Sequence, residues 1–195
     1  MEPSRAAIAG VTMSNSKPYK LLVTLAIVGL VIALAIGGLL FTQNNTGVPQ
    51  EYFPKPAVAA KEAAPDFKLV LLDGNNFQLA DHKGKPIFIN FFASWCLPCK
   101  DEMPAIEKIA SAYQPKGVVF LAISTDDTES SAKEFVKKYG VTIPVGIDKS
   151  TDIQKAYGLY GIPTTYFIDK QGMVNYFHSG TVTEELMQHE LDKLL

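Results

Sequence analysis

The stretch NFFASWCLPCKDEMP, residues 90–104, contains the two cysteines of this 195-residue chain, Cys96 and Cys99. An apolar, aromatic run precedes them. A spacing of three residues brings two sulfur atoms to one face of a helical turn, within reach of a disulfide bond. Small secreted domains held by disulfides usually contain four or more cysteines. The pair is therefore either a working dithiol or a single structural bridge.

A buried strand leads into this stretch and a helix follows it. Residues Pro86–Phe92, PIFINFF, are nearly all apolar, which is typical of a strand covered on both faces. Helical spacing of apolar residues then continues over Leu97–Tyr113. Cys96 falls at the junction, where unpaired backbone N–H groups and the positive end of the helix dipole favour a thiolate. Pro98 lies in the first helical turn and stiffens the segment between the sulfur atoms.

Short strands and helices alternate through the rest of the region. A hairpin is expected from strands at Phe67–Leu72 and Asn76–Leu79, because Asp73-Gly74 between them favours a tight turn. The other predicted elements are strands at Val118–Ser124, Pro144–Ile147, Thr164–Asp169 and Met173–Gly180, and helices at Ser130–Tyr139, Asp152–Tyr157 and Thr183–Leu194. This order predicts an α/β domain with a mixed central β-sheet flanked by helices and an N-terminal β-hairpin extension.

The first 64 residues predict a membrane anchor and a tether. Leu21–Phe41 contains no charge and would reach roughly 30 Å as a helix, which matches the hydrocarbon core of a bilayer. The basic residues before it favour a cytoplasmic location for residues 1–20 and place the rest outside. Residues 42–64 mix polar, Pro and Ala residues and predict a linker to a domain at 65–195. A cleavable signal peptide is the alternative, but its apolar region is usually shorter.

Glu102 is the candidate residue for proton transfer. It follows Cys99 by three residues, so that Cys96, Cys99 and Glu102 form a row along one side of the predicted helix. A carboxylate in this row can take the proton that Cys99 must lose before it attacks a mixed disulfide. The alternative is an exposed charge near the N-terminal end of a helix, where carboxylates are mildly favoured.

Two segments together resemble a known family. FFASWCLPCKDEMP and GIPTTYFID are similar to the thioredoxin superfamily and, within it, to the membrane-anchored TlpA-like and ResA-like thiol-disulfide oxidoreductases related to the alkyl hydroperoxide reductase branch. The lead-in DGNNFQLADHKGK strengthens the resemblance, which covers Pro65 to Leu195. It implies a thioredoxin-like fold.

The resemblance also assigns roles to individual residues. It implies that Pro163 is cis beside a redox-active Cys96–Cys99 disulfide, with Cys96 at the surface and Cys99 shielded, and that the backbone of Ile162 pairs with a substrate chain. Trp95 would belong to the docking surface, and the alternative is an aromatic side chain that only packs at the end of a strand. Many thioredoxins have a buried aspartate where this chain has Asn90, and ResA-like proteins use a glutamate at the position of Glu102 instead.

As a function, the resemblance implies an extracytoplasmic thiol-disulfide oxidoreductase that reduces disulfides in exported proteins. Apocytochrome c before haem attachment is the example we expect, with electrons from a membrane thiol carrier. No dissociable cofactor is required beyond the Cys96–Cys99 pair. The direction of electron flow depends on the reduction potentials of the partners, which a sequence does not contain.

Other functions are less consistent with the sequence. A net charge of −2 argues against a nucleic-acid partner. Zinc usually takes four ligands, and this chain has no second cysteine pair. A copper-delivery protein of related fold would have Cys-x-x-x-Cys. A peroxiredoxin would have threonine three residues before Cys96, where Ala93 stands. A tethered chaperone or metallochaperone with a purely structural disulfide remains an alternative.

Overall fold

The computed structural model describes residues 22–32 and 59–195. Residues 22–32 form a helix in which every residue is exposed and most are large and apolar, Leu22, Leu25 and Leu30 among them. Within the described residues, no helix has the length and apolar character needed to cross a membrane. The remainder of the predicted anchor, the N-terminal segment 1–20 and linker residues 42–58 lie outside the described residues.

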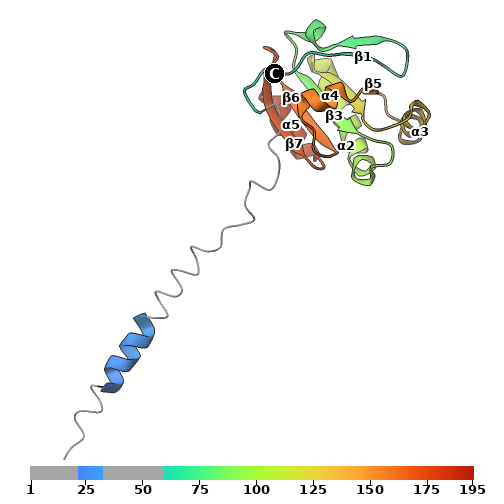
Figure 1. Cartoon of the computed structure of the whole chain (residues 1–195). Coiled ribbons are helices and arrows are strands. Elements are labelled where there is room, and N and C mark those ends of the chain that lie inside the picture. The colour runs from blue at the N-terminus through green and yellow to red at the C-terminus, as the bar shows by residue number, and fades with distance from the viewer. Residues whose placement is uncertain (1–21, 33–58) are drawn as a thin grey trace, which may run out of the picture. The chain divides into compact units, whose positions relative to one another are not determined.

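The folded domain is organised around a five-stranded sheet (Figure 1). Its strand order is β5-β4-β3-β6-β7, with bounds β3 Ile87–Phe92, β4 Val119–Ser124, β5 Val145–Ile147, β6 Thr164–Ile168 and β7 Val174–Ser179. β3, β4 and β5 are parallel, whereas β6 and β7 are antiparallel to their neighbours. The predicted α/β class with a mixed sheet is therefore confirmed, and each predicted strand lies within one or two residues of its observed position.

Helices cover both faces of this sheet. The side chains of Phe88 and Phe92 in β3 pack with α2, Leu97–Tyr113, α3, Glu129–Tyr139, and α5, Glu184–Asp192. The alternate side chains Ile87, Ile89 and Phe91 pack on the other face with α4, Asp152–Tyr157, and the N-terminal hairpin. Every residue of β3 is buried, as expected of a strand that is apolar except for Asn90.

The helix ends follow from local sequence. The side chain of Thr128 accepts a hydrogen bond from the Ser131 N–H and begins α3, and Thr183 does the same for α5 with the Leu186 N–H. Gly140 ends α3 with a φ of 63°, in the left-handed region that glycine adopts without strain. Short 3₁₀ helices, η2 at Leu79–His82 and η3 at Gln114–Lys116, complete the described elements.

The predicted N-terminal hairpin is present as a separate two-stranded sheet. β1, Lys68–Val70, pairs with β2, Asn76–Gln78, and Gly74 makes the turn with a φ of 89°. The hairpin reaches the main sheet through a bridge between Leu71 and Gly146 of β5. Both strands are shorter than predicted, because Leu72 hydrogen-bonds to Val145 of β5 and Leu79 begins the 3₁₀ helix η2.

The folded domain also begins earlier than the predicted boundary at residue 65. The Lys61 N–H donates to the Val174 carbonyl at 2.7 Å, and the Val174 N–H donates to the Glu62 carbonyl at 2.8 Å. The Ala64 N–H donates to the Gly172 carbonyl. Residues 61–64 therefore extend the sheet at its β7 edge instead of belonging to the linker. Their composition gave no sign of this, because the pairing depends on a strand more than a hundred residues away.

Candidate active site

Three loops meet where the central strands end. β3 and β4 are parallel and in register, with Phe92 opposite Ser124, so the segments that follow them leave the sheet at the same end, the carboxyl end of these strands. β6 runs the other way and begins with Thr164 opposite Phe91, so the segment before it lies there too. Residues 93–97, 125–128 and 160–163 therefore form a common rim. The predicted site residues Trp95, Cys96, Ile162 and Pro163 belong to this rim, and Pro98 follows it in the first turn of α2.

The two cysteines form a disulfide at the start of α2. Cys96 is the N-cap residue of the helix and Cys99 is in its first turn, with their Cα atoms 5.3 Å apart. The Cys96 Sγ accepts a hydrogen bond from the Cys99 backbone N–H at 3.2 Å. Pro98 lies at the second helical position, where its missing N–H costs no helical hydrogen bond. The sulfur of Cys96 therefore sits where the helix end stabilises negative charge.

Both cysteines are largely shielded in this oxidised form. Cys96 is 5% exposed and Cys99 is completely buried. Cys96 is the more exposed of the two cysteines, as the resemblance implies, but it is buried and does not lie openly at the surface. Cys96 is thus the sulfur that an approaching substrate can reach, whereas Cys99 can react only with an atom already inside the site.

Glu102 lies inside the domain. Its side chain is 1% exposed, so the alternative of a solvent-exposed helix charge is wrong. Its Oε2 accepts a hydrogen bond from the Val182 N–H at 2.8 Å, and its Oε1 accepts one from the Asn90 Nδ2 at 2.9 Å. Burial raises the pKa of Glu102 to about 7, and these two hydrogen bonds oppose part of the rise. A carboxyl group with this pKa can both accept and release a proton near neutral pH.

Asn90 and Thr165 complete this buried network. Asn90 lies on β3 opposite Thr165 on β6, and its Nδ2 also donates to the Thr165 Oγ1 at 3.0 Å. Both side chains are fully buried. The contact between Glu102 and Val182 was not predicted, because it joins residues 80 positions apart. Thr165 belongs to the GIPTTYFID segment, but the sequence did not indicate that its hydroxyl meets Asn90.

The outer side of the site is apolar and exposed. Trp95 is 61% exposed and Leu97 is 67% exposed, and they flank Cys96 in the sequence. The Trp95 Nε1 donates a hydrogen bond to the Asp126 carbonyl at 3.2 Å. Tyr160, in the loop before β6, is 62% exposed. Exposed large apolar side chains around a reactive group are typical of a surface that contacts another protein.

Asp127 joins two of the three rim loops, and sequence reasoning did not identify it. One of its carboxylate oxygens accepts from the Ser94 N–H at 2.8 Å, and the other accepts from the Ser94 hydroxyl at 2.8 Å. The carboxylate also accepts from the Ser124 hydroxyl and the Thr128 N–H. This arrangement connects the residue two positions before Cys96 to the end of β4. The available signal was an aspartate three residues after the end of a predicted buried strand.

The loop before β6 contains the remaining predicted residues. The Ile162–Pro163 peptide bond is cis, as the resemblance implies. The Thr164 hydroxyl donates to the Gly161 carbonyl at 2.8 Å, and the Gly180 N–H donates to the Pro163 carbonyl at 2.9 Å. Within the described part of the chain, no hydrogen bond involves the backbone N–H or carbonyl of Ile162. These two groups remain available to a chain that binds alongside.

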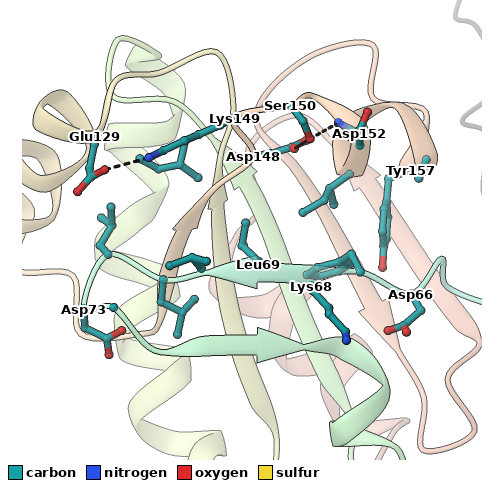
Figure 2. Close-up of a pocket in the computed structure, with 18 of the residues that line it drawn as sticks. Asp66, Lys68, Leu69, Asp73, Glu129, Asp148, Lys149, Ser150, Asp152 and Tyr157 are labelled. Carbon is teal, nitrogen blue, oxygen red and sulfur yellow. Dashed lines mark hydrogen bonds and ion pairs between the residues drawn. The ribbon is translucent and has the colours of Figure 1, made fainter.

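A separate pocket of about 950 Å³ lies beside the hairpin (Figure 2), and neither cysteine lines it. β1, Ile147 to Ser150, the start of α3 and one side of α4 line it, and it contains none of the predicted site residues. Glu129 at its margin pairs with Lys133 at 2.8 Å and Lys149 at 3.0 Å, and these hydrogen bonds lower the pKa of Glu129 to about 2. In the part of the chain that the structure describes, no group of three His, Cys, Asp or Glu side chains is arranged to hold a metal ion.

A dithiol at a helix N-terminus, a buried carboxyl group one turn further on and a mixed sheet define a thiol-disulfide oxidoreductase with a thioredoxin-like fold. The chain belongs to the AhpC/TSA family, whose model matches residues 60–177. This confirms the family resemblance that the sequence motifs indicated, and the curated relatives that follow, which are named thiol-disulfide oxidoreductases, support the enzyme class.

Two curated relatives support this assignment. The chain is 35% identical to the thiol-disulfide oxidoreductase ResA of Geobacillus kaustophilus over 178 residues, which cover 91% of this chain and 98% of the relative. It is 39% identical to the ResA protein of Bacillus cereus (strain ATCC 10987) over 146 residues, 74% of this chain and 84% of the relative. The first match extends well beyond the folded domain into the N-terminal region.

Solved structures agree on the fold. A thiol:disulfide interchange protein of the thioredoxin family from Chlorobium tepidum superposes with a TM-score of 0.64 at 29% identity, covering 70% of this chain and 97% of that one. StoA of Bacillus subtilis superposes with a TM-score of 0.59 at 22% identity, covering 66% of this chain and 97% of that one. At this lower identity, the likeness concerns the fold alone.

Proposed function

We propose that this protein is a membrane-anchored, extracytoplasmic reductase of disulfides in exported proteins. The observation that carries the reaction is the Cys96–Cys99 disulfide at the start of α2, with the carboxyl group of Glu102 buried one helical turn after Cys99. Apocytochrome c before haem attachment is the substrate we favour, in agreement with the ResA-like motifs. A substrate of this kind offers two cysteines close together in an extended chain.

The reduced protein would start the reaction. The Cys96 thiolate attacks one sulfur of the substrate disulfide, which forms a mixed disulfide and releases the other substrate sulfur as a thiolate. Cys99 then loses its proton and attacks the Cys96 Sγ. The Cys96–Cys99 bond forms, the mixed disulfide breaks, and the substrate leaves with two thiols. Two electrons have passed from the dithiol to the substrate.

Glu102 would accept the proton that Cys99 loses in this second step. Cys99 is completely buried, so water does not readily take its proton. Glu102 lies three residues further along α2, where side chains are neighbours on the helix surface. Because burial raises the pKa of Glu102 to about 7, the ionised carboxylate is a base of useful strength at neutral pH.

The exposed rim supports a polypeptide substrate. Trp95 and Leu97 supply apolar contact area beside Cys96, and the unpaired backbone groups of Ile162 can hydrogen-bond an extended chain next to the sulfur. A folded protein with a deeply buried disulfide would not reach Cys96, which is itself only 5% exposed. Unfolded or extended segments are therefore the preferred substrates.

The proposed location rests on the N-terminal region. The helix at residues 22–32 is uncharged and mostly apolar, and the uncharged sequence continues to Phe41. An anchor at Leu21–Phe41, with residues 1–20 in the cytoplasm, places the active site outside the membrane. The oxidised site must then be reduced again, and a membrane thiol carrier is the donor we propose. The Cys96–Cys99 pair transfers two electrons itself, so the proposal includes no dissociable cofactor.

Trapping of mixed disulfides tests this function. In the Cys99→Ala variant, Cys96 is the single cysteine left in the chain, so each disulfide-linked adduct must include it. We expect adducts with exported proteins that contain neighbouring cysteines, and none in the Cys96→Ala/Cys99→Ala control. A membrane-impermeant thiol reagent added to intact cells should also block Cys96.

Two results would contradict the proposal. If Cys99→Ala captures no protein and the wild-type disulfide resists mild reductants, the bridge is a structural staple, as in a tethered chaperone. If the impermeant reagent modifies Cys96 only after the cells are lysed, the domain is not extracytoplasmic.

A further inference from the structure

The amide of Asn90 makes an unusual set of hydrogen bonds for a fully buried group. Its Nδ2 uses both hydrogens, one to the Glu102 Oε1 at 2.9 Å and one to the Thr165 Oγ1 at 3.0 Å. Its Oδ1 is also buried and has no hydrogen-bond partner among the described residues. A buried amide oxygen without a partner costs free energy, and most buried polar atoms avoid that cost. The amide is thus oriented by donation alone.

This orientation matches an ionised Glu102. A carboxylate can only accept hydrogen bonds, and its Oε2 already accepts one from the Val182 N–H. The reverse orientation of the amide would direct its oxygen at a negatively charged oxygen. The Thr165 hydroxyl accepts the second Nδ2 hydrogen and fixes the position of the amide, while the charge on Glu102 selects the donating orientation. Glu102 therefore receives two N–H donors, one from the backbone and one that depends on two side chains.

We propose that Asn90 is a positioning residue that stabilises the charged form of Glu102, and that Thr165 holds the Asn90 amide in the position this requires. Together they set the pH range in which Glu102 accepts and releases its proton. The effect on exchange rests on the proposed function, whereas the effect on Glu102 itself does not. The Val182 donor is a backbone N–H, which a side-chain substitution does not remove. The second hydrogen bond to Glu102 depends on the side chains of Asn90 and Thr165, so substitutions there should change the pKa of Glu102.

The elements around Glu102 contain other titratable groups. They are Cys96 and Cys99 at the start of α2, His178 on β7, which lies opposite Thr165, and Glu184 and Glu185 at the start of α5. The pKa of Glu102 is raised by burial and lowered by the hydrogen bonds from Val182 and Asn90, rather than by a charged neighbour. In the oxidised protein the cysteines do not titrate, which leaves Glu102 as the buried group to follow.

The test is a ¹³C NMR titration of the Glu102 carboxyl carbon in the oxidised full-length protein in mild detergent. Asn90→Leu removes the donor at similar volume and should raise the Glu102 midpoint by roughly one pH unit, since a hydrogen bond to a charged group is lost. Thr165→Val should raise it by a smaller amount, roughly half a unit. Thr165→Ser keeps the hydroxyl and should leave the midpoint at the wild-type value.

The pH profile of substrate reduction gives a second readout. In Asn90→Leu the acid limb should move to higher pH with the Glu102 midpoint, which lowers the rate at pH 7 roughly fivefold. In the Glu102→Gln background the same change should not move the profile further. A residue with a purely structural role would lower the rate in both backgrounds and leave the midpoint in place.

Clear results would overturn the inference. If Asn90→Leu folds, as judged by its circular dichroism, and its Glu102 midpoint equals that of the wild type, the proposal is wrong. If Asn90→Leu does not fold, equal midpoints in Thr165→Val and Thr165→Ser would refute it. Because the titration needs no substrate, a protein that fails to exchange disulfides but shows these shifts would refute only the proposed function.

Discussion

The outer and inner sides of the Cys96–Cys99 disulfide have opposite surroundings. On the outer side, Trp95 and Leu97 are mostly exposed, and their loop is held by the Asp127 carboxylate and the Asp126 carbonyl. On the inner side, Cys99 and Glu102 are buried, and hydrogen bonds connect Glu102 to β3 and to the segment before α5.

This difference shows how one helical turn can serve two tasks. The outer side offers apolar contact and free backbone groups, which suit recognition of a chain. The inner side excludes water, and for that reason the pKa of Glu102 rises to about 7 and the carboxyl group becomes useful for proton transfer. Changes on the inner side should therefore alter pH dependence, whereas changes on the outer side should alter substrate binding.

The largest effect is expected at Glu102. Glu102→Gln removes the buried base and should lower the rate of disulfide exchange at pH 7 by about 100-fold, mainly in the step that Cys99 performs. Stopped-flow measurement with a peptide disulfide separates the two steps. Asp101→Asn, at the exposed neighbouring carboxylate, is the matched control and should behave like the wild type. Equal rates in Glu102→Gln and Asp101→Asn would contradict the role of Glu102 as the buried base on the inner side of the disulfide.

The next effect is expected at Asp127. Asp127→Ala removes the carboxylate that holds Ser94 and should reduce the rate with a protein substrate by about tenfold and stability by about 2 kcal/mol. The acid limb of the pH–rate profile of this variant should not move, because Glu102 and its hydrogen bonds are unchanged. Asp126→Asn is the control, because Asp126 contributes its carbonyl to Trp95. A shift of the acid limb in Asp127→Ala would mean that the two sides are coupled.

A smaller effect is expected at Trp95. Trp95→Ala removes exposed contact area, so KM for a protein substrate should rise several-fold while the rate with a small disulfide reagent is unchanged. Stability should change by no more than about 0.5 kcal/mol, because the side chain is 61% exposed. A loss of the same size with the small reagent would show that Trp95 acts on the sulfur chemistry instead of on docking.

The smallest effect on activity is expected at the hairpin. A Cβ added at Gly146 would lie 2.4 Å from the Leu69 Cδ2 and 2.6 Å from its Cγ, so Gly146→Ala should destabilise the domain by about 1–3 kcal/mol. Exchange by the folded fraction should be unchanged. Urea unfolding measures this loss of stability. The double variant Gly146→Ala/Leu69→Ala should lose less stability than the sum of the losses in the two single variants, because Leu69→Ala removes the atoms that the added Cβ would meet. An altered pH profile would show that the hairpin and the active site are linked.

Much of the fold could be predicted from the sequence because its signals are local. The nearly continuous apolar run at Pro86–Phe92 indicated a central strand, and the helical spacing after Cys96 gave the bounds of α2. The Asp73-Gly74 turn located the hairpin. The pairing of residues 61–64 with β7 could not be predicted in this way, since those residues have no strand pattern of their own.

The site was predictable to the same extent. The cysteine spacing and the helix start placed Cys96 and Cys99, and the resemblance indicated cis Pro163 and the importance of Glu102. The sequence did not settle whether Glu102 is exposed or buried, because helical spacing places it on a row that drifts around the helix. The partners of Glu102 come from β3 and from the segment before α5, which only the fold brings together.

The pH dependence of stability tests most directly whether burial makes Glu102 a proton carrier. Its pKa is about 7 in the folded protein and about 4.5 without burial, so the folded state holds the proton more tightly. The stability that Glu102 contributes is therefore complete below pH 4.5 and is lost as the pH rises through 7. From urea unfolding of the oxidised protein, we predict that the stability of the wild type relative to Glu102→Gln falls by about 3 kcal/mol between pH 4 and pH 8. A difference that stays constant over this range would contradict the account.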